Sequence, residues 1–335
     1  MAPFITNSEY IILMSLPSHM LSEHDMSRLE KAGVKTVYSN LYWFNVEKHM
    51  GERDWSYYDD FVLSARNAGL KVMMTPCEPP SFLPDDWYSR NERGRIWNEF
   101  PTWCHLSPWH TEAQSYQDVF YVEARDHYNA QDVMIVAGSA HGGEALLPYD
   151  LAYYDPSALA SWYNFIGKQE LPPKPIHATP ERTPELMNWL KVTLVEQYVH
   201  HKKIFDTHPS REAWTALHHC WENHLQSGNQ FIADVVQRVK DDVAPDHYSA
   251  ICFGYWWIGG PLAARARSYM EMGLPLWVGS EYAAGLPRYT KVAIEQGLRG
   301  FITRPWAYED NGNLTDDLVR QYANSIQSWR EARVG

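Results

Sequence analysis

Two glutamates, Glu144 and Glu281, stand among small residues just after two apolar segments of the chain. Glu144 lies in DVMIVAGSAHGGEALLP (132–148), and Glu281 lies in WVGSEYAAG (277–285). Glu144 is the only carboxylate in AHGGEALLP (140–148), the part that follows the expected strand, and Glu281 is the only one in WVGSEYAAG. The small neighbours of both would let a substrate approach closely. Hydrolysis of a glycosidic bond needs one carboxylic acid that protonates the leaving oxygen and a second carboxylate opposite it. The two motifs therefore predict a pair that flanks a sugar.

Aromatic side chains are abundant, with 15 Trp, 21 Tyr and 11 Phe. A flat indole fits the apolar face of a pyranose ring, while the sugar hydroxyls need polar partners nearby. Both kinds of residue follow the expected strands. The candidates for substrate binding are Trp43, Glu47, Glu78, Ser139, His141, His218, Trp221, Glu222, Tyr255, Trp256, Trp257, Arg304 and Trp306.

Each carboxylate also has a structural interpretation. Glu144 would be favoured by the helix dipole in the first turn of a helix, and Glu281 would pair with Arg304 in a buried ion pair. Glu47, Glu78 and Glu222 are reserve candidates for the second carboxylate. His141, His218 and His219 lack the HxH or HExxH spacing of a metal site, so neither a metal nor a cofactor is expected.

Eight apolar segments alternate with amphipathic ones. The expected strands cover 10–16, 36–43, 71–77, 132–139, 212–221, 248–257, 275–282 and 300–308, and the clearest helices cover 22–34, 55–70, 261–274 and 286–298. Eight strand–helix units predict a (β/α)8 barrel, one α/β domain over residues 1–335. A doubly wound open sheet is the alternative, but it would more often carry an early glycine-rich nucleotide loop, which is absent. The long connections 78–131 and 145–211 predict elaborated loops over one end of the barrel, each with more than one helix.

At Glu144 and Glu281 the chain resembles the large clan of retaining glycoside hydrolases that are (β/α)8 barrels. Members of that clan have an acid/base on strand four and a nucleophile on strand seven. The run LYWFNVEKHMGERDWSYYDDFVLSARNAGLKVMMTPCEPPSFLPDDW (41–87) is most similar to family 42 β-galactosidases, and RNERGRIWNEF (90–100) continues the likeness. The resemblance implies that Glu144 is the acid/base, that Glu281 is the nucleophile and that Trp306 lines the site.

One position departs from that clan. The residue before the acid/base glutamate is usually Asn, which holds the sugar 2-hydroxyl, but here it is Gly143. The motif GSAHGGEALLPY (138–149) instead resembles the β-amylases of family 14, which invert the anomeric configuration. Three readings stay open: a retaining hydrolase, an inverting one, and a carbohydrate-binding barrel without catalysis.

Charge and hydropathy indicate which kinds of binding partner the chain is expected to have. The net charge of -12 and the pI of about 5.6 argue against a nucleic acid or an anionic membrane surface as partner. No run approaches the roughly 18 apolar residues of a membrane-spanning helix. The N-terminal segment lacks the basic and small-residue features of a signal peptide, and the four cysteines form no CxxC pair. A cytoplasmic location and a carbohydrate partner are expected, and a homo-oligomer stays open.

Overall fold

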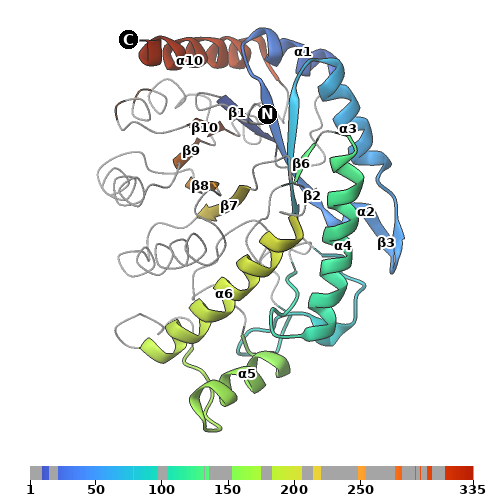
Figure 1. Cartoon of the computed structure of the whole chain (residues 1–335), viewed down its shortest axis with the longest axis vertical. Helices are drawn as coiled ribbons and strands as arrows, with labels where there is room; N and C mark the ends of the chain where they lie inside the picture. Colours follow the sequence, from blue (N-terminus) through green and yellow to red (C-terminus); the bar gives the residue numbers. More distant parts are fainter. Residues whose placement is uncertain are drawn as a thin grey trace.

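Eight parallel strands form one sheet at the centre of the chain (Figure 1). The computed structural model describes residues 10–14, 22–77, 79–96, 104–131, 133–135, 153–174, 183–205, 214–219, 248–253, 276–280, 291, 295, 300–303 and 314–334. The strands are β1 (Tyr10–Met14), β2 (Thr36–Tyr42), β5 (Lys71–Cys77), β6 (Met134–Ile135), β7 (Trp214–His219), β8 (Tyr248–Phe253), β9 (Leu276–Ser280) and β10 (Gly300–Thr303). All eight predicted strands are confirmed, and the chain is of the α/β class.

The order of the strands is β6-β5-β2-β1-β10-β9-β8-β7. Apart from β6 and β7, strands of this sheet that follow one another along the chain lie side by side. The first strand also pairs with the last: Tyr10 of β1 is in register with Phe301 of β10. A doubly wound sheet would place the first strand beside the second and the fourth. The observed order therefore differs from the open-sheet alternative. Within the described residues, β6 and β7 end the order and do not pair with each other.

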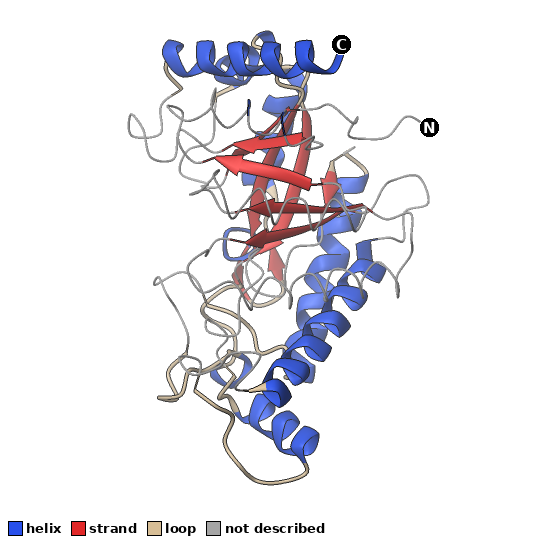
Figure 2. Ribbon diagram, turned by 90° about the vertical axis from the view of Figure 1, so that its left-hand side faces the viewer, coloured by secondary structure: helices blue, strands red, loops and turns tan. Residues whose placement is uncertain are grey.

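Helices lie outside this sheet, as Figure 2 shows. They are α1 (Glu23–Lys31), α2 (Trp43–Val46), α3 (Ser56–Asn67), the 3-10 helix η2 (Asp85–Trp87), α4 (Thr111–Asn129), α5 (Pro156–Ile166), α6 (Pro184–Phe205) and α10 (Asp316–Val334). The predicted helices at 22–34 and 55–70 are confirmed as α1 and α3. Those at 261–274 and 286–298 lie outside the described residues, apart from the helical positions 291 and 295.

Local sequence determines where α1 begins and ends. The Ser22 side chain accepts a hydrogen bond from the Asp25 backbone N–H at 3.2 Å, which caps the first turn. After the helix, Gly33 has φ of 101°, a left-handed conformation that a side chain would strain. A Cβ atom at this glycine would also stand 3.1 Å from Ile326 and 3.2 Å from Arg330 of α10. Gly33 thus ends α1 and lets α10 pack closely against the turn.

Both long connections contain helices. The segment 78–131 holds η2 and α4, and the segment 145–211 holds α5 and α6, as predicted. The loop before α4 is itself structured, because Tyr88 forms an antiparallel bridge with Leu106, and Arg90 forms one with Ile96. The Tyr88 hydroxyl also accepts a hydrogen bond from the Leu83 backbone N–H at 3.1 Å. A small hairpin of β3 (Glu47–His49) and β4 (Glu52–Arg53) follows α2.

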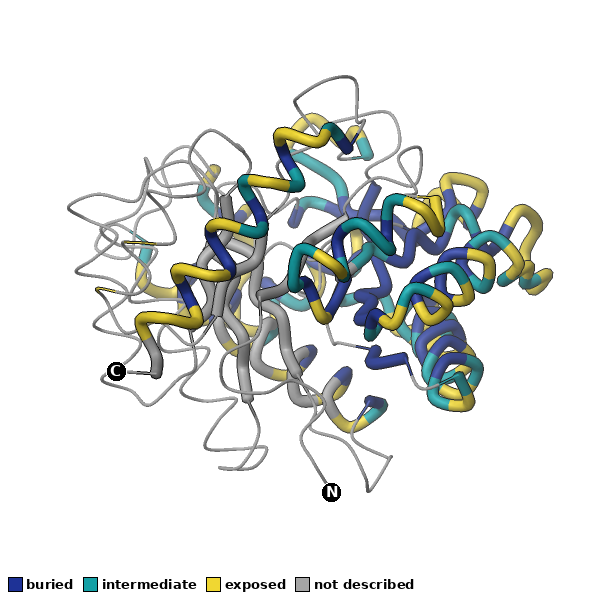
Figure 3. The backbone as a smooth tube through the Cα atoms, turned by 90° about the horizontal axis from the view of Figure 1, so that it is seen from above, coloured by how far each residue is buried: buried dark blue, intermediate teal, exposed yellow. Residues whose placement is uncertain are grey.

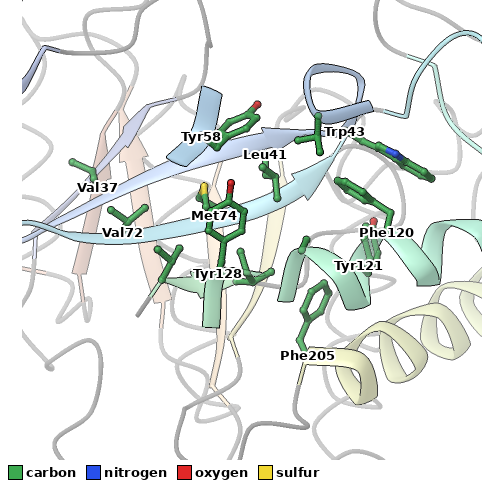
Figure 4. Packing of buried hydrophobic residues seen from close by; sticks show 14 of the residues in the cluster. Val37, Leu41, Trp43, Tyr58, Val72, Met74, Phe120, Tyr121, Tyr128 and Phe205 are labelled. Carbon is green, nitrogen blue, oxygen red and sulfur yellow. The ribbon is translucent and has the colours of Figure 1, made fainter. Parts of the chain in front are cut away.

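The core lies between the sheet and its helices. Six successive residues of β5, Val72 to Cys77, are buried, which explains why this strand shows no polar alternation. Val37 and Met74 of the sheet belong to one buried cluster with Tyr58 of α3 and Tyr128 of α4, and Figure 4 shows Met74 beside Tyr128. Along the helices, buried positions form an inner stripe and exposed ones an outer stripe (Figure 3). The apolar faces of the amphipathic helices therefore pack toward the sheet, and their polar faces are exposed.

The buried ionisable residues include His201, which is 1% exposed. The ring of His201 on α6 packs edge-on against Tyr121 at 4.9 Å, and its Nε2 has no hydrogen-bond partner among the described residues. Burial, and then the neighbouring His200, lower the pKa of His201 to about 3. The native protein therefore holds this imidazole neutral at pH values where an unfolded chain protonates it.

Acid is expected to destabilise the fold through His201. Because the folded pKa lies below the unfolded value of about 6.5, the unfolded state binds more protons below that pH. His201 alone should then cost up to about 1.4 kcal/mol of stability for each pH unit below 6.5. Urea unfolding between pH 7 and pH 4 should show a shallower loss for His201→Leu than for the unchanged protein. The exposed-residue control His24→Leu should keep the full slope, and equal slopes for all three proteins would contradict the expectation.

Candidate active site

Every pairing between the eight strands is parallel, so their carboxyl ends all lie at the same end of the sheet. In α/β folds ligands bind at the carboxyl ends of the strands. Ser280, the last residue of β9, immediately precedes Glu281. Glu144 follows β6, which the structure describes only over Met134–Ile135. Both glutamates follow a strand in the sequence, and their own positions lie outside the described residues.

Most predicted site residues lie outside the described residues, so their roles stay predictions. These are Glu78, Ser139, His141, Glu144, Trp221, Glu222, Tyr255, Trp256, Trp257, Glu281, Arg304 and Trp306. His218 is described as the fifth residue of β7, in register with Cys252 of β8. Its role in substrate binding stays a prediction as well.

Trp43 and Glu47 lie just beyond the carboxyl end of β2, where the sequence placed them, and both are buried. The Glu47 carboxylate accepts hydrogen bonds from the Trp43 indole N–H and the Tyr116 hydroxyl. It also accepts one from the Gly51 backbone N–H at 2.7 Å, within the turn between β3 and β4. These contacts connect the end of β2, the β3–β4 hairpin and α4 through one carboxylate.

Arg53 supplies the opposite charge. Its side chain is 10% exposed and forms ion pairs with Glu47 and, through Nε at 2.8 Å, with Glu123. The guanidinium lies 5.5 Å from the ring centres of both Tyr116 and Phe120, within the range of a cation–π contact. Burial opposes the charged form, but the hydrogen bonds that Arg53 donates to Tyr116 and Glu47, together with the charges of Glu47 and Glu123, outweigh it, and the pKa of Arg53 is raised. Arg53 therefore stays charged beside Glu47.

Aromatic rings enclose this ion pair. The Trp43 indole stacks on Phe120 with ring centres 4.6 Å apart and planes 4° apart, and it lies 5.8 Å from the Tyr116 ring. Trp55 stacks on the same Phe120 at 5.7 Å. We call Trp43, Glu47, Arg53, Tyr116 and Phe120 the Glu47 cluster. Its geometry is that of a structural support, and a contact of Trp43 or Glu47 with substrate stays a prediction.

The cluster also bears on the reserve role of Glu47. A catalytic carboxylate must reach the substrate, whereas this one is fully buried and already engaged by two side chains, a backbone N–H and an arginine. Such a group orients its neighbours. Sequence reasoning missed Arg53 and Tyr116. The only available indication was Arg53 in the polar turn GERDW (51–55) shortly after Glu47, because Tyr116 lies 69 residues away.

Among the described residues, no group of three or more His, Cys, Asp or Glu side chains is placed to hold a metal ion. In the same part of the chain, no helix combines the length and the apolar character needed to cross a bilayer.

Comparisons with known proteins give one kind of match. No family model matches the sequence, and no curated protein matches it. Solved structures do match: a β-galactosidase from the psychrophilic Marinomonas ef1 superposes with a TM-score of 0.70 at 12% identity, over 96% of this chain. The polyextremophilic β-galactosidase of the Antarctic haloarchaeon Halorubrum lacusprofundi gives the same score at 13% identity, also over 96% of this chain. The chain has their fold.

The likeness covers only part of those enzymes. The chain spans 59% of the Marinomonas protein and 58% of the Halorubrum protein. At this level of identity the match concerns the arrangement of the backbone. Activity and substrate have to be argued from the residues.

Proposed function

We propose that the chain is a glycoside hydrolase on a closed (β/α)8 barrel, with Glu144 and Glu281 as its catalytic carboxylates. The observation that carries the proposal is the order of the eight parallel strands, in which β1 pairs with β10 and every other neighbour follows chain order. That order is cyclic except for the step between β6 and β7. Pairing of these two strands would close the sheet into the barrel that the sequence predicts.

Closure would also bring the two glutamates into useful positions. In a closed barrel, β9 would be the third strand from β6 on the path through β7 and β8. On the path through β5, β2, β1 and β10 it would be the fifth. Residues that follow β6 and β9 would then stand on nearly opposite sides of the barrel opening, with room for a sugar between them. The fold shared with two β-galactosidases supports this use of the scaffold and makes a β-galactoside the first substrate to test.

The proposed chemistry needs no cofactor. Glu144, protonated, donates its proton to the leaving oxygen while the Glu281 carboxylate attacks the anomeric carbon and forms a glycosyl-enzyme. Water, deprotonated by Glu144, then releases the sugar and regenerates both groups. If Glu281 activates a water instead of attacking, the configuration inverts. Carboxyl groups about 5–5.5 Å apart favour retention, and a separation of about 6.5–9.5 Å favours inversion.

A second candidate is a carbohydrate-binding barrel without catalysis. Gly143 favours it, because this residue replaces the asparagine that commonly holds the sugar 2-hydroxyl next to the acid/base. Both carboxylates are nevertheless present in the sequence, so we place hydrolysis first. A single domain over 1–335, a homo-oligomer and a cytoplasmic location are further parts of the proposal that the described residues leave open.

Incubation with a panel of nitrophenyl glycosides tests the proposal. We expect release of nitrophenol from at least one β-glycoside, with the β-galactoside first. Proton NMR of the first anomer formed then distinguishes retention from inversion. A chelator should leave the rate unchanged, and inactivation by it would indicate a metal-dependent hydrolase instead. Saturable sugar binding without any product would support the non-catalytic alternative.

A further inference from the structure

A pocket of about 560 Å³ lies between α4, α5 and α6, outside the sheet. Its described walls come from the turn before α4, from α4 itself, from α5 and from α6, and none comes from a strand. The volume falls within the roughly 300–1,000 Å³ of sites that bind small molecules. In Figures 1 and 2, α5 lies with the first turns of α4 and α6 at one end of the molecule.

One side of the pocket is aromatic and fixed in place. Trp109 stacks on Trp189 with ring centres 4.5 Å apart and planes 9° apart. Both indole N–H groups are used: Trp109 donates to the Thr193 hydroxyl and Trp189 to the Ser161 hydroxyl, each at 3.1 Å. The rings therefore keep one orientation. Trp189 is buried behind Trp109, and the partly exposed Trp109 ring lines the pocket with its indole N–H already engaged.

Large apolar side chains remain exposed beside these rings. Phe165 of α5 is 41% exposed and Val192 of α6 is 42% exposed, and both line the pocket. Each bulky residue left in water forgoes the stabilisation of burial, which is about 25 cal/mol per Å² of apolar surface. A ligand with an apolar face would recover part of it.

The rest of the lining is polar and rich in acceptors. Asn164 and Glu196 are exposed, and no hydrogen bond or ion pair joins their side chains to another described residue. Gln197 donates through Nε2 to Gln114 at 3.2 Å, but its buried Oε1 has no partner in the described part of the chain. No Lys or Arg stands among the described lining residues, so a bound anion would lack a counter-charge.

We propose that this pocket is a second carbohydrate-binding site, which holds one or two sugar units away from the catalytic carboxylates. The apolar face of a pyranose would lie on the exposed Phe165 ring and the partly exposed Trp109 ring, and its hydroxyls would donate to Glu196 and Gln197. Hydroxyls also accept, which satisfies the Asn164 amide N–H groups that an alkylammonium ion would leave unpaired. The proposal goes beyond hydrolysis, because binding here breaks no bond.

A local probe tests it. In the full chain labelled with 5-fluorotryptophan, the fluorine NMR signal of Trp109, assigned through Trp109→Phe, should shift saturably with lactose, cellobiose or maltose. The double variant Asn164→Ala/Phe165→Ala should weaken the fitted affinity about tenfold, which equals about 1.4 kcal/mol. Phe82→Ala is the matched control, because Phe82 is 43% exposed and does not line the pocket. That control should leave the affinity unchanged.

Two results would overturn the proposal. One is equal affinity in the pocket variant and the Phe82→Ala control. The other is a Trp109 signal that none of the three disaccharides shifts. The cation n-butylammonium is tested in parallel, and a shift with this cation alone would overturn the proposal in the same way. Turnover of a nitrophenyl glycoside is followed in parallel and should stay unchanged in the pocket variant. If no glycoside is cleaved but the Trp109 signal still shifts with sugar, only the proposal of hydrolysis fails.

Discussion

Turnover of the best nitrophenyl glycoside is expected to fall by about 10²–10⁴-fold in Glu144→Gln, the usual contribution of a general acid–base group. Glutamine has nearly the shape of glutamate but neither donates the required proton nor removes one from water. The loss should be smaller for leaving groups that need no protonation. A plot of rate against leaving-group pKa would therefore be steeper for the variant than for the unchanged protein.

Glu281→Gln is expected to lose at least as much, because the amide neither attacks the anomeric carbon nor activates a water. Azide separates the two roles in a retaining enzyme. With Glu144→Ala it should give a glycosyl azide of retained configuration, and with Glu281→Ala one of inverted configuration.

The exposed carboxylate Glu112, in the first turn of α4, supplies the matched control for both variants. Glu112→Gln should keep turnover close to that of the unchanged protein, and all the variants should keep the same circular dichroism. Near-normal turnover in a folded Glu144→Gln or Glu281→Gln would remove that residue from the mechanism. One of the reserve carboxylates, Glu78 or Glu222, would then be tested in the same way.

The second large effect concerns stability. Glu47→Gln should lower the free energy of unfolding by about 3–5 kcal/mol, because it leaves the largely buried Arg53 without its closest counter-charge. Replacing both partners, as Glu47→Gln/Arg53→Met, should recover part of this loss, since no unpaired charge is then buried. Urea unfolding of the two single variants and the double variant gives the coupling energy of the pair.

Glu52→Gln is the control for this series. Glu52 lies next to Arg53 in β4 but is exposed, so its replacement should change stability by less than about 0.5 kcal/mol. If Glu47→Gln were no less stable than Glu52→Gln, the Glu47 cluster would not support the fold. An unchanged stability together with a lower kcat/KM would instead favour the substrate contact that the sequence predicted.

Strand positions were readable from the sequence because they depend on local composition. The run KVMMTPC (71–77) is apolar throughout, and it forms β5, which is buried from Val72 to Cys77. Ser22 and Gly33 bracket α1 because a capping hydroxyl and a left-handed residue act over a single turn. A left-handed glycine, Gly69, also follows α3, although the N-cap residue Trp55 makes no side-chain capping bond. Class and element order therefore follow from residues that are close in the sequence.

What Glu47 and Trp43 contact was decided only by the tertiary structure. The sequence placed both correctly after β2, and from that position alone it predicted contact with substrate. The fold brings Tyr116 and Phe120 of α4 against them, and these contacts bury the pair. The pocket between α4, α5 and α6 likewise joins Trp109 to Trp189, 80 residues apart. A sequence pattern reports whether a side chain prefers burial or water, but its partner depends on how distant segments pack, and that follows from the whole chain.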